Sequence, residues 1–191
     1  ADQTVEETLA QLQASREEIR RVAAGMTDAD LDRPTWFPFI FGMGDGWVPA
    51  RMPLGFCITH DWSEFMQLRI HSGAKAPVPS PGITNQYLGA MIGMAFPMAL
   101  DKEAADGDEF TAVFAFSDPG VSSFTIRVAD GSAVAEPGQE TDADLVITES
   151  AETFEKAFRG ITSFPEAMQA GDIQVSNMEG LAKFGTLFPM Q

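Results

Sequence analysis

The chain has 191 residues, of which 45% are hydrophobic and 21% are charged, so it can bury a core and is not expected to be disordered. Its net charge of −16 is uneven, because the first hundred residues hold 11 acidic and seven basic residues and the remainder hold 17 and five. This charge excludes nucleic acid and anionic lipid surfaces as expected partners, since both repel an acidic protein.

The cysteine content indicates the cellular compartment, and the lengths of the apolar runs indicate whether a segment could cross a membrane. The single cysteine, Cys57, excludes an internal disulfide and is typical of a reducing compartment, so we expect a cytoplasmic protein. No signal peptide is evident in the polar, acidic start of the chain. The longest uncharged apolar run, residues 87–100, has 14 residues and contains Pro97, which is too short to cross a bilayer. We therefore expect no stable membrane insertion; the sequence leaves the oligomeric state open.

Two capping signatures predict helices at the N-terminal end. Thr4 and Glu7 form a capping box in front of an apolar stripe with helical spacing, and Gly25 ends this first helix. Residues 27–30 repeat the signature, so they are expected to open a single turn that stops before Pro34.

An aromatic segment follows. Residues 34–53 are rich in proline, glycine and aromatic side chains, which predicts a loop rather than a regular helix or a central strand. Loops this apolar usually fold onto another surface. Trp36, Phe39 and Trp47 are therefore expected to act as a gate over an apolar site.

A second helix is predicted over residues 54–71 and a third over about residues 83–105, kinked or broken near Pro97. A polyproline-like connector, residues 74–82, joins them. At 100° per residue, the second helix has one apolar face and one polar face. The expected apolar face is formed by Cys57, Ile58, Trp62, Phe65 and Leu68, and the polar face by His60, Glu64, Gln67 and His71.

The hydrophobic period changes from helical to two just after residues 104–108, AADGD. These residues therefore mark the predicted domain boundary. We expect a helical segment over 1–106 and a second domain over 107–191.

Strands alternate with turns, and then with helices, in the second half. The pattern predicts an α+β fold class. The predicted strands cover residues 110–116, 124–128, 133–136, 143–148 and 172–176. Asp130-Gly131 is a hairpin signal, and Ser150, Ser163 and Asn177 are expected to begin helices, because their side chains are good N-caps.

Several marks in the second half occur together in one order. They are the hairpin Asp130-Gly131, the strand 144–148 running into a helix, Arg159-Gly160, a helix with Pro165, and Gly171-Asp-Ile-Gln-Val before a closing Phe. Over residues 108–189 this order resembles the sterol carrier protein domain, the type-two lipid-binding module, although that family usually has glycine where this chain has Asn177. The resemblance implies a five-stranded, mostly antiparallel sheet with helices on one face. It also implies an apolar tunnel, partly closed by the last helix.

The resemblance implies a hydrophobic small-molecule ligand, such as a fatty acyl chain, an isoprenoid or a sterol-like lipid, and no cofactor. The 15 phenylalanines and 10 methionines suit an adaptable apolar lining. Any single one of these side chains is more often plain core packing. The candidate tunnel residues are Phe114, Phe116, Phe124, Ile126, Phe154, Phe158, Phe164, Met168, Met178, Leu181, Phe184 and Phe188.

Residues 4–35 and 58–70 resemble the start of a DinB-like helical bundle, as in mycothiol-dependent maleylpyruvate isomerases. In those enzymes a metal, held by a His of the second helix and by an acid/His pair of a later helix, activates a thiol. His60 stands at the first ligand and Glu64 lies one turn later, but the later helix has no His, so the motif lacks two ligands.

We therefore expect a lipid-binding protein rather than an enzyme, with no catalytic residue and no metal site. The alternative is a metal- and thiol-dependent isomerase or transferase that uses His60 and Glu64. A third hypothesis is a ligand-free module that binds a protein partner through the apolar residues 36–47.

Overall fold

The computed structural model describes residues 4–36, 47–72 and 80–189. The chain divides into two units, Ala1–Leu54 and Gly55–Gln191. The predicted gate residue Phe39 and most of the predicted connector 74–82 lie outside the described residues.

The first unit contains helices α1 (Val5–Ala24) and α2 (Asp28–Asp32). Both begin with the predicted capping box. In α1, the Glu7 N–H donates to Thr4 Oγ1 at 3.2 Å, and the Glu7 carboxylate accepts from the Thr4 N–H at 2.8 Å. No residue of α1 is buried, so its apolar stripe faces solvent in this structure.

The sequence analysis predicted a loop over the whole aromatic segment, residues 34–53. This prediction is wrong at the two ends of the segment. Its two ends pair as antiparallel strands β1 (Pro34–Trp36) and β2 (Trp47–Pro49), with Thr35 opposite Val48. The prolines are tolerated because a two-stranded sheet has only edge strands.

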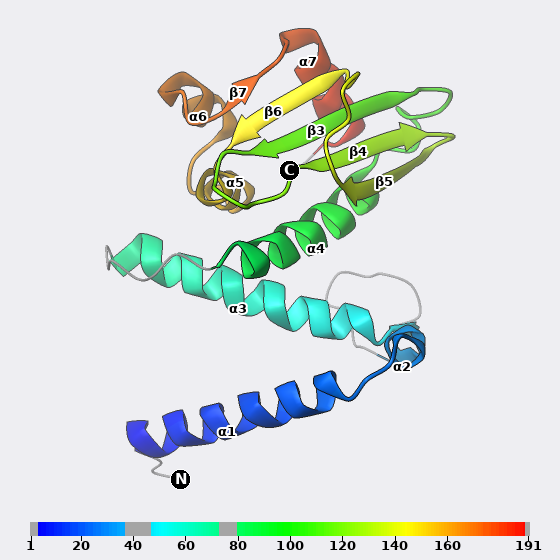
Figure 1. Ribbon diagram of the computed structural model, residues 1–191. Coiled ribbons are helices and arrows are strands. Elements are labelled where there is room, and N and C mark those ends of the chain that lie inside the picture. Colours follow the sequence, from blue (N-terminus) through cyan, green and yellow to red (C-terminus); the bar gives the residue numbers. More distant parts are fainter. Residues whose placement is uncertain (1–3, 37–46, 73–79, 190–191) are drawn as a thin grey trace. The chain divides into compact units, whose positions relative to one another are not determined.

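The second unit holds the sheet and most of the helices (Figure 1). Its helices are α3 (Arg51–Ser72, which begins in the first unit), α4 (Pro81–Ala99), α5 (Ala151–Phe158), α6 (Phe164–Ala170) and α7 (Met178–Leu187). Its strands are β3 (Phe110–Phe116), β4 (Phe124–Ala129), β5 (Ser132–Pro137), β6 (Leu145–Glu149) and β7 (Gln174–Val175).

The five strands form one mixed sheet in the order β5-β4-β3-β6-β7. Only the β3–β6 pair is parallel, so the predicted five-stranded, mostly antiparallel sheet is confirmed. The β4–β5 hairpin turns at Asp130 and Gly131, whose φ angles of 51° and 66° lie in the left-handed region that a two-residue turn of this kind requires.

One face of the sheet carries the hydrophobic core. Phe110, Ala112 and Phe114 of β3 alternate onto this face and are buried. Helices α4, α5 and α7 cover it, since Phe114 contacts Phe154 of α5 and Phe184 of α7 with ring centroids 5.9 Å apart in both pairs. The helices therefore lie on one face of the sheet, as expected.

Two glycines allow helices to lie close to the sheet. A Cβ at Gly89 of α4 would meet the Phe124 ring at 3.3 Å, and one at Gly180 of α7 would lie 2.7 Å from the Asp144 carbonyl oxygen. Asn177 caps α7, accepting from the Gly180 N–H at 2.6 Å and donating to the Asp144 carbonyl at 2.9 Å. The start of α7 is thus fixed to the residue before β6.

Helix α4 continues past Pro97 and ends at Ala99, six residues earlier than predicted. Beyond it, the Asp101 N–H donates to the Leu187 carbonyl at 2.8 Å, which ties this turn to the end of α7. Helix α4 is therefore a member of the core of the second unit. The predicted boundary between two domains at residues 106/107 stays a prediction.

A buried carboxylate joins three helices. Glu155 of α5 is fully buried, and it accepts hydrogen bonds from Ser63 Oγ of α3 at 2.8 Å, from the Tyr87 hydroxyl of α4 and from Arg159 Nε at 2.7 Å. Trp62 of α3 stacks on Tyr87 with ring centroids 3.8 Å apart. These contacts hold α3 against α4 and α5.

The same contacts correct the predicted apolar face of the second helix. Among the α3 side chains that the structure describes, Trp62, Ser63 and Met66 are buried, whereas Cys57 is exposed and Leu68 is 69% exposed. The side chain of Ile58, also predicted on this face, lies outside the described ones. The contacts of α3 with α4 and α5 determine which of its faces is buried. The hydrophobic pattern of α3 alone does not reveal these contacts.

We expect Tyr87→Phe to lower the free energy of unfolding by about 1–3 kcal/mol, because it leaves one buried Glu155 oxygen without its donor. Urea denaturation at neutral pH measures this. A matched control is Glu136→Gln, which removes an exposed ion pair to Arg127 and should cost at most about 1 kcal/mol. Equal costs for the two variants would contradict a structural role for the buried network.

Candidate functional site

An apolar cavity of about 980 Å³ lies between the core face of the sheet and the helices that cover it. It is bounded by β3 and β6 on the sheet side, and by α4, α5, the start of α6 and α7 on the helix side. The lining residues are Ala95, Phe96, Ala99, Phe114, Ile147, Glu149, Phe154, Ala157, Phe158, Arg159, Gly160, Phe164, Pro165, Leu181, Phe184, Gly185, Phe188 and Pro189.

The cavity has a buried end and an exposed end. Phe96, Phe114 and Phe184 are among its buried residues and form an aromatic cluster, with the Phe96 ring 5.2 Å from Phe114 and 5.5 Å from Phe184. Phe158 is 38% exposed, and Gly185 is also exposed, so the mouth lies near the C-terminal halves of α5 and α7.

Seven of the twelve candidate tunnel residues line this cavity, namely Phe114, Phe154, Phe158, Phe164, Leu181, Phe184 and Phe188. Phe116, Phe124, Ile126 and Met168 belong to the surrounding hydrophobic core instead. Met178 is 63% exposed at the start of α7. The structure thus brings most of the set together, while ligand binding by these residues stays a prediction.

The predicted gate residues belong to the first unit. Trp36 is 57% exposed at the end of β1, and Trp47 begins β2. Their proposed role as a gate stays a prediction.

Glu149 is one of the lining residues that the sequence analysis missed. It is the last residue of β6, where Leu145, Ile147 and Glu149 all face the core, and it is only 3% exposed. Its Oε2 is buried and has no hydrogen-bond partner among the described residues. Burial raises the pKa of the Glu149 carboxyl to about 8, because an apolar surrounding disfavours the charged form. The carboxyl is therefore protonated in the folded protein at neutral pH.

A sequence signal for Glu149 existed. The predicted strand ended at residue 148. The alternation of buried and partly buried side chains along β6 continues for one more residue, and it places Glu149 on the core side. An acidic residue in register with the core-facing positions of a strand is a candidate for a functional carboxyl.

Arg159 is the other charged residue of the lining. Its Nε lies 2.7 Å from Glu155 Oε1, inside the buried network that joins α3, α4 and α5. The positive charge of Arg159 is therefore balanced by a carboxylate, and the cavity offers no unbalanced cation from its lining.

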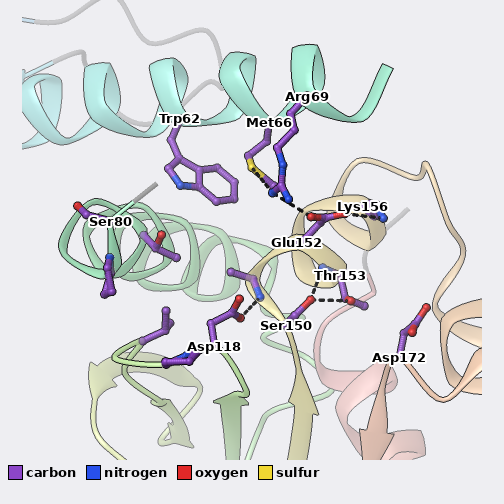
Figure 2. A pocket seen from close by; sticks show the side chains of 15 residues that line it. Trp62, Met66, Arg69, Ser80, Asp118, Ser150, Glu152, Thr153, Lys156 and Asp172 are labelled. Carbon is purple, nitrogen blue, oxygen red and sulfur yellow. Dashed lines mark hydrogen bonds and ion pairs between the residues drawn. The ribbon is translucent and has the colours of Figure 1, made fainter. Parts of the chain in front are cut away.

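A second hollow, of about 560 Å³, lies between α3, the start of α4, the β3–β4 connection and α5 (Figure 2). Its charged groups are largely paired. Arg69 lies 3.0 Å from Glu152, Lys156 lies 2.8 Å from the same carboxylate, and Asp118 accepts from the Ala151 N–H at 2.7 Å. This hollow is the more polar of the two, and it is the less suited to an apolar ligand.

The residues of the metal-site hypothesis lie on the exposed side of α3. His60 Nε2 is 4.0 Å from Glu64 Oε1, and both side chains are more than half exposed. Over the described ranges 4–36, 47–72 and 80–189, no group of three or more His, Cys, Asp or Glu residues is placed to hold a metal ion. None of the helices in the described part of the chain combines the length and hydropathy that a membrane crossing requires.

The fold and the cavity define an α+β domain with an apolar cavity between its sheet and its helices. Residues 86–190 match the family described as alkyl sulfatase C-terminal, and the chain belongs to this family. Residues 1–67 match the DinB superfamily, which confirms the DinB resemblance of the N-terminal segment. A search of curated proteins gave no match.

Solved structures with a similar chain path include both alkylsulfatases and sterol carrier proteins. The sec-alkylsulfatase Pisa1 from Pseudomonas sp. is 16% identical, with a TM-score of 0.42, over 88% of this chain and 31% of that enzyme. Sterol carrier protein 2 from Yarrowia lipolytica is 15% identical, with a TM-score of 0.41, over 59% of this chain and 98% of that one. The sterol carrier protein domain 2 of Helicoverpa armigera is 17% identical, with a TM-score of 0.45, over 58% and 90%. This chain thus spans about a third of the length of the alkylsulfatase.

We expect Glu149→Gln to change the pH dependence of stability. The folded pKa of about 8 is above the value of 4.5 for a free carboxyl, so the folded state holds a proton that the unfolded state releases as pH rises between these values. The contribution of Glu149 to the free energy of unfolding is fully present below pH 4.5. Above that pH it falls by about 1.4 kcal/mol per pH unit until pH 8. The wild type should therefore lose about 3 kcal/mol relative to the variant between pH 4.5 and pH 7.

Urea denaturation of both proteins from pH 5 to pH 8 measures this difference. Glu149→Leu is the control, because it also lacks the titrating group and should run parallel to Glu149→Gln. Parallel curves for the wild type and the Gln variant would show that the folded protein does not hold this proton.

Proposed function

We propose that this chain binds a hydrophobic small molecule, such as a fatty acyl chain, an isoprenoid or a sterol-like lipid, in the cavity lined by Glu149. The observation that carries the proposal is the lining itself. The lining contains seven phenylalanines and two ionisable residues, Glu149 and Arg159. The volume of about 980 Å³ lies at the upper end of the range of about 300–1,000 Å³ typical of small-molecule sites.

The driving force is burial of apolar surface. A ligand that buries roughly 300 Å² of apolar surface gains about 7 kcal/mol at 25 cal/mol per Å², before the entropy of association is subtracted. Aromatic side chains supply large contact areas at low entropic cost, since each has only two side-chain torsions. This energy suits reversible binding of a carried molecule.

Membership of the alkyl sulfatase C-terminal family supports the same proposal. An alkyl group is an apolar chain, which is the kind of ligand that the lining would accept. We propose that the chain holds or hands over such a molecule. Helix α7 and its C-cap, with Leu181, Gly185 and Phe188 in the lining, would form the movable side of the cavity.

Gly185 provides a direct test. It is an exposed helical residue of the lining, and a Cβ placed on it meets no atom within 4 Å, so a larger side chain can be introduced there. We expect Gly185→Leu to weaken binding of the apolar fluorophore N-phenyl-1-naphthylamine by roughly 10-fold or more, because the new side chain occupies ligand space. Fluorescence titration of lipid-extracted protein measures the change.

Ala182→Leu is the matched control, because Ala182 is exposed on the same helix and does not line the cavity. This variant should bind the fluorophore as the wild type does. Absence of fluorophore binding to the wild type, or equal affinities in all three proteins, would contradict binding in this cavity.

A further inference from the structure

We propose that the carboxyl group of Glu149 selects ligands whose polar end is an uncharged oxygen, as in a long-chain alcohol, over ligands with an anionic end. This inference rests on the proposed function, and it names the chemical class of ligand for the same cavity.

The position of Glu149 is the first argument. Glu149 lines the cavity at the end of β6, it is 3% exposed, and its Oε2 has no hydrogen-bond partner among the described residues. A buried polar group without a partner costs free energy in the empty protein. A ligand oxygen that forms a hydrogen bond with this carboxyl removes that cost, whereas a plain hydrocarbon does not.

The protonation state is the second argument. Because burial holds the pKa of Glu149 near 8, the group is a neutral carboxylic acid at neutral pH, and its O–H can donate to a ligand oxygen. An alcohol can accept this bond and donate one in return. An anionic end has to lose its hydration on entering an apolar cavity, which is costly unless a cation is present.

The charged groups around the cavity supply no such cation. Helix α4 carries no charged residue. On the other helices packed around the cavity, the cations are paired with carboxylates: Arg159 with Glu155, Lys156 with Glu152 and Lys183 with Asp108. The remaining charged groups of α6 and α7 are acidic: Glu166 accepts from Ser163, and Glu179 is exposed. A neutral ligand end is therefore favoured next to Glu149.

The test compares 1-decanol with decanoate as competitors of N-phenyl-1-naphthylamine, at pH 6 and pH 9.5, in the wild type, Glu149→Gln and Glu149→Leu. In the wild type, decanol should bind at least 10-fold more tightly than decanoate at pH 6. The difference should widen by pH 9.5, because a carboxyl that ionises near pH 8 then repels the decanoate anion while it still accepts a hydrogen bond from the decanol hydroxyl. Glu149→Gln keeps a neutral donor, so it should retain decanol binding with less than a twofold change over this pH range.

Glu149→Leu should bind decanol about fivefold more weakly than the wild type at pH 6, as expected for the loss of one neutral hydrogen bond. The fluorophore carries no oxygen, so its own affinity should be little changed in the three proteins. Its affinity at each pH, together with the circular dichroism spectrum, shows that the cavity is intact.

The other outcomes separate the two proposals. Tighter binding of decanoate than of decanol, lost in Arg159→Gln, would overturn the inference and make Arg159 the partner of an anionic ligand. A preference for decanol over decanoate that is independent of both pH and the residue at position 149 would also overturn it, while leaving apolar binding intact. If neither the fluorophore nor decanol binds the wild type, the proposed function itself fails.

Discussion

The buried carboxylate of Glu155 is the constraint on which the helical layer depends. A buried charge is tolerated only when hydrogen bonds and an opposite charge replace its hydration. Ser63 and Tyr87 supply hydrogen bonds from α3 and α4, and Arg159 supplies both a hydrogen bond and a positive charge. Three helices must therefore keep one mutual arrangement. A cluster held by dispersion alone, by contrast, tolerates small shifts.

This network also determines the electrostatics of the cavity. Arg159 belongs to both structures, since it lines the cavity and pairs with Glu155. Because its charge is balanced there, Glu149 faces an apolar lining with no unbalanced cation, and burial alone raises its pKa. The stability of the helical layer and the chemistry of the cavity thus depend on the same guanidinium group.

Local signals were sufficient for most elements of the second unit. The alternation of apolar residues predicted β3 and β4, Asp130-Gly131 predicted their hairpin neighbour β5, and the N-cap residues Ser150, Ser163 and Asn177 predicted α5, α6 and α7. These features depend on neighbours in sequence, namely backbone dihedrals, caps and the period of two. Seven of the twelve candidate tunnel residues lie in the lining of one cavity.

The sequence by itself therefore determined the strands, the turns, the helix caps and the apolar character of the core face. Only the tertiary structure decided that α4 belongs to the core of the sheet and which face of α3 is buried. It also decided that Glu149 lines the cavity with its Oε2 unpartnered among the residues that the structure describes. The physical reason is the range of the interactions. Periodicity and capping act within a few residues, whereas burial, pairing and the pKa of a carboxyl depend on groups that the fold brings together from distant parts of the chain.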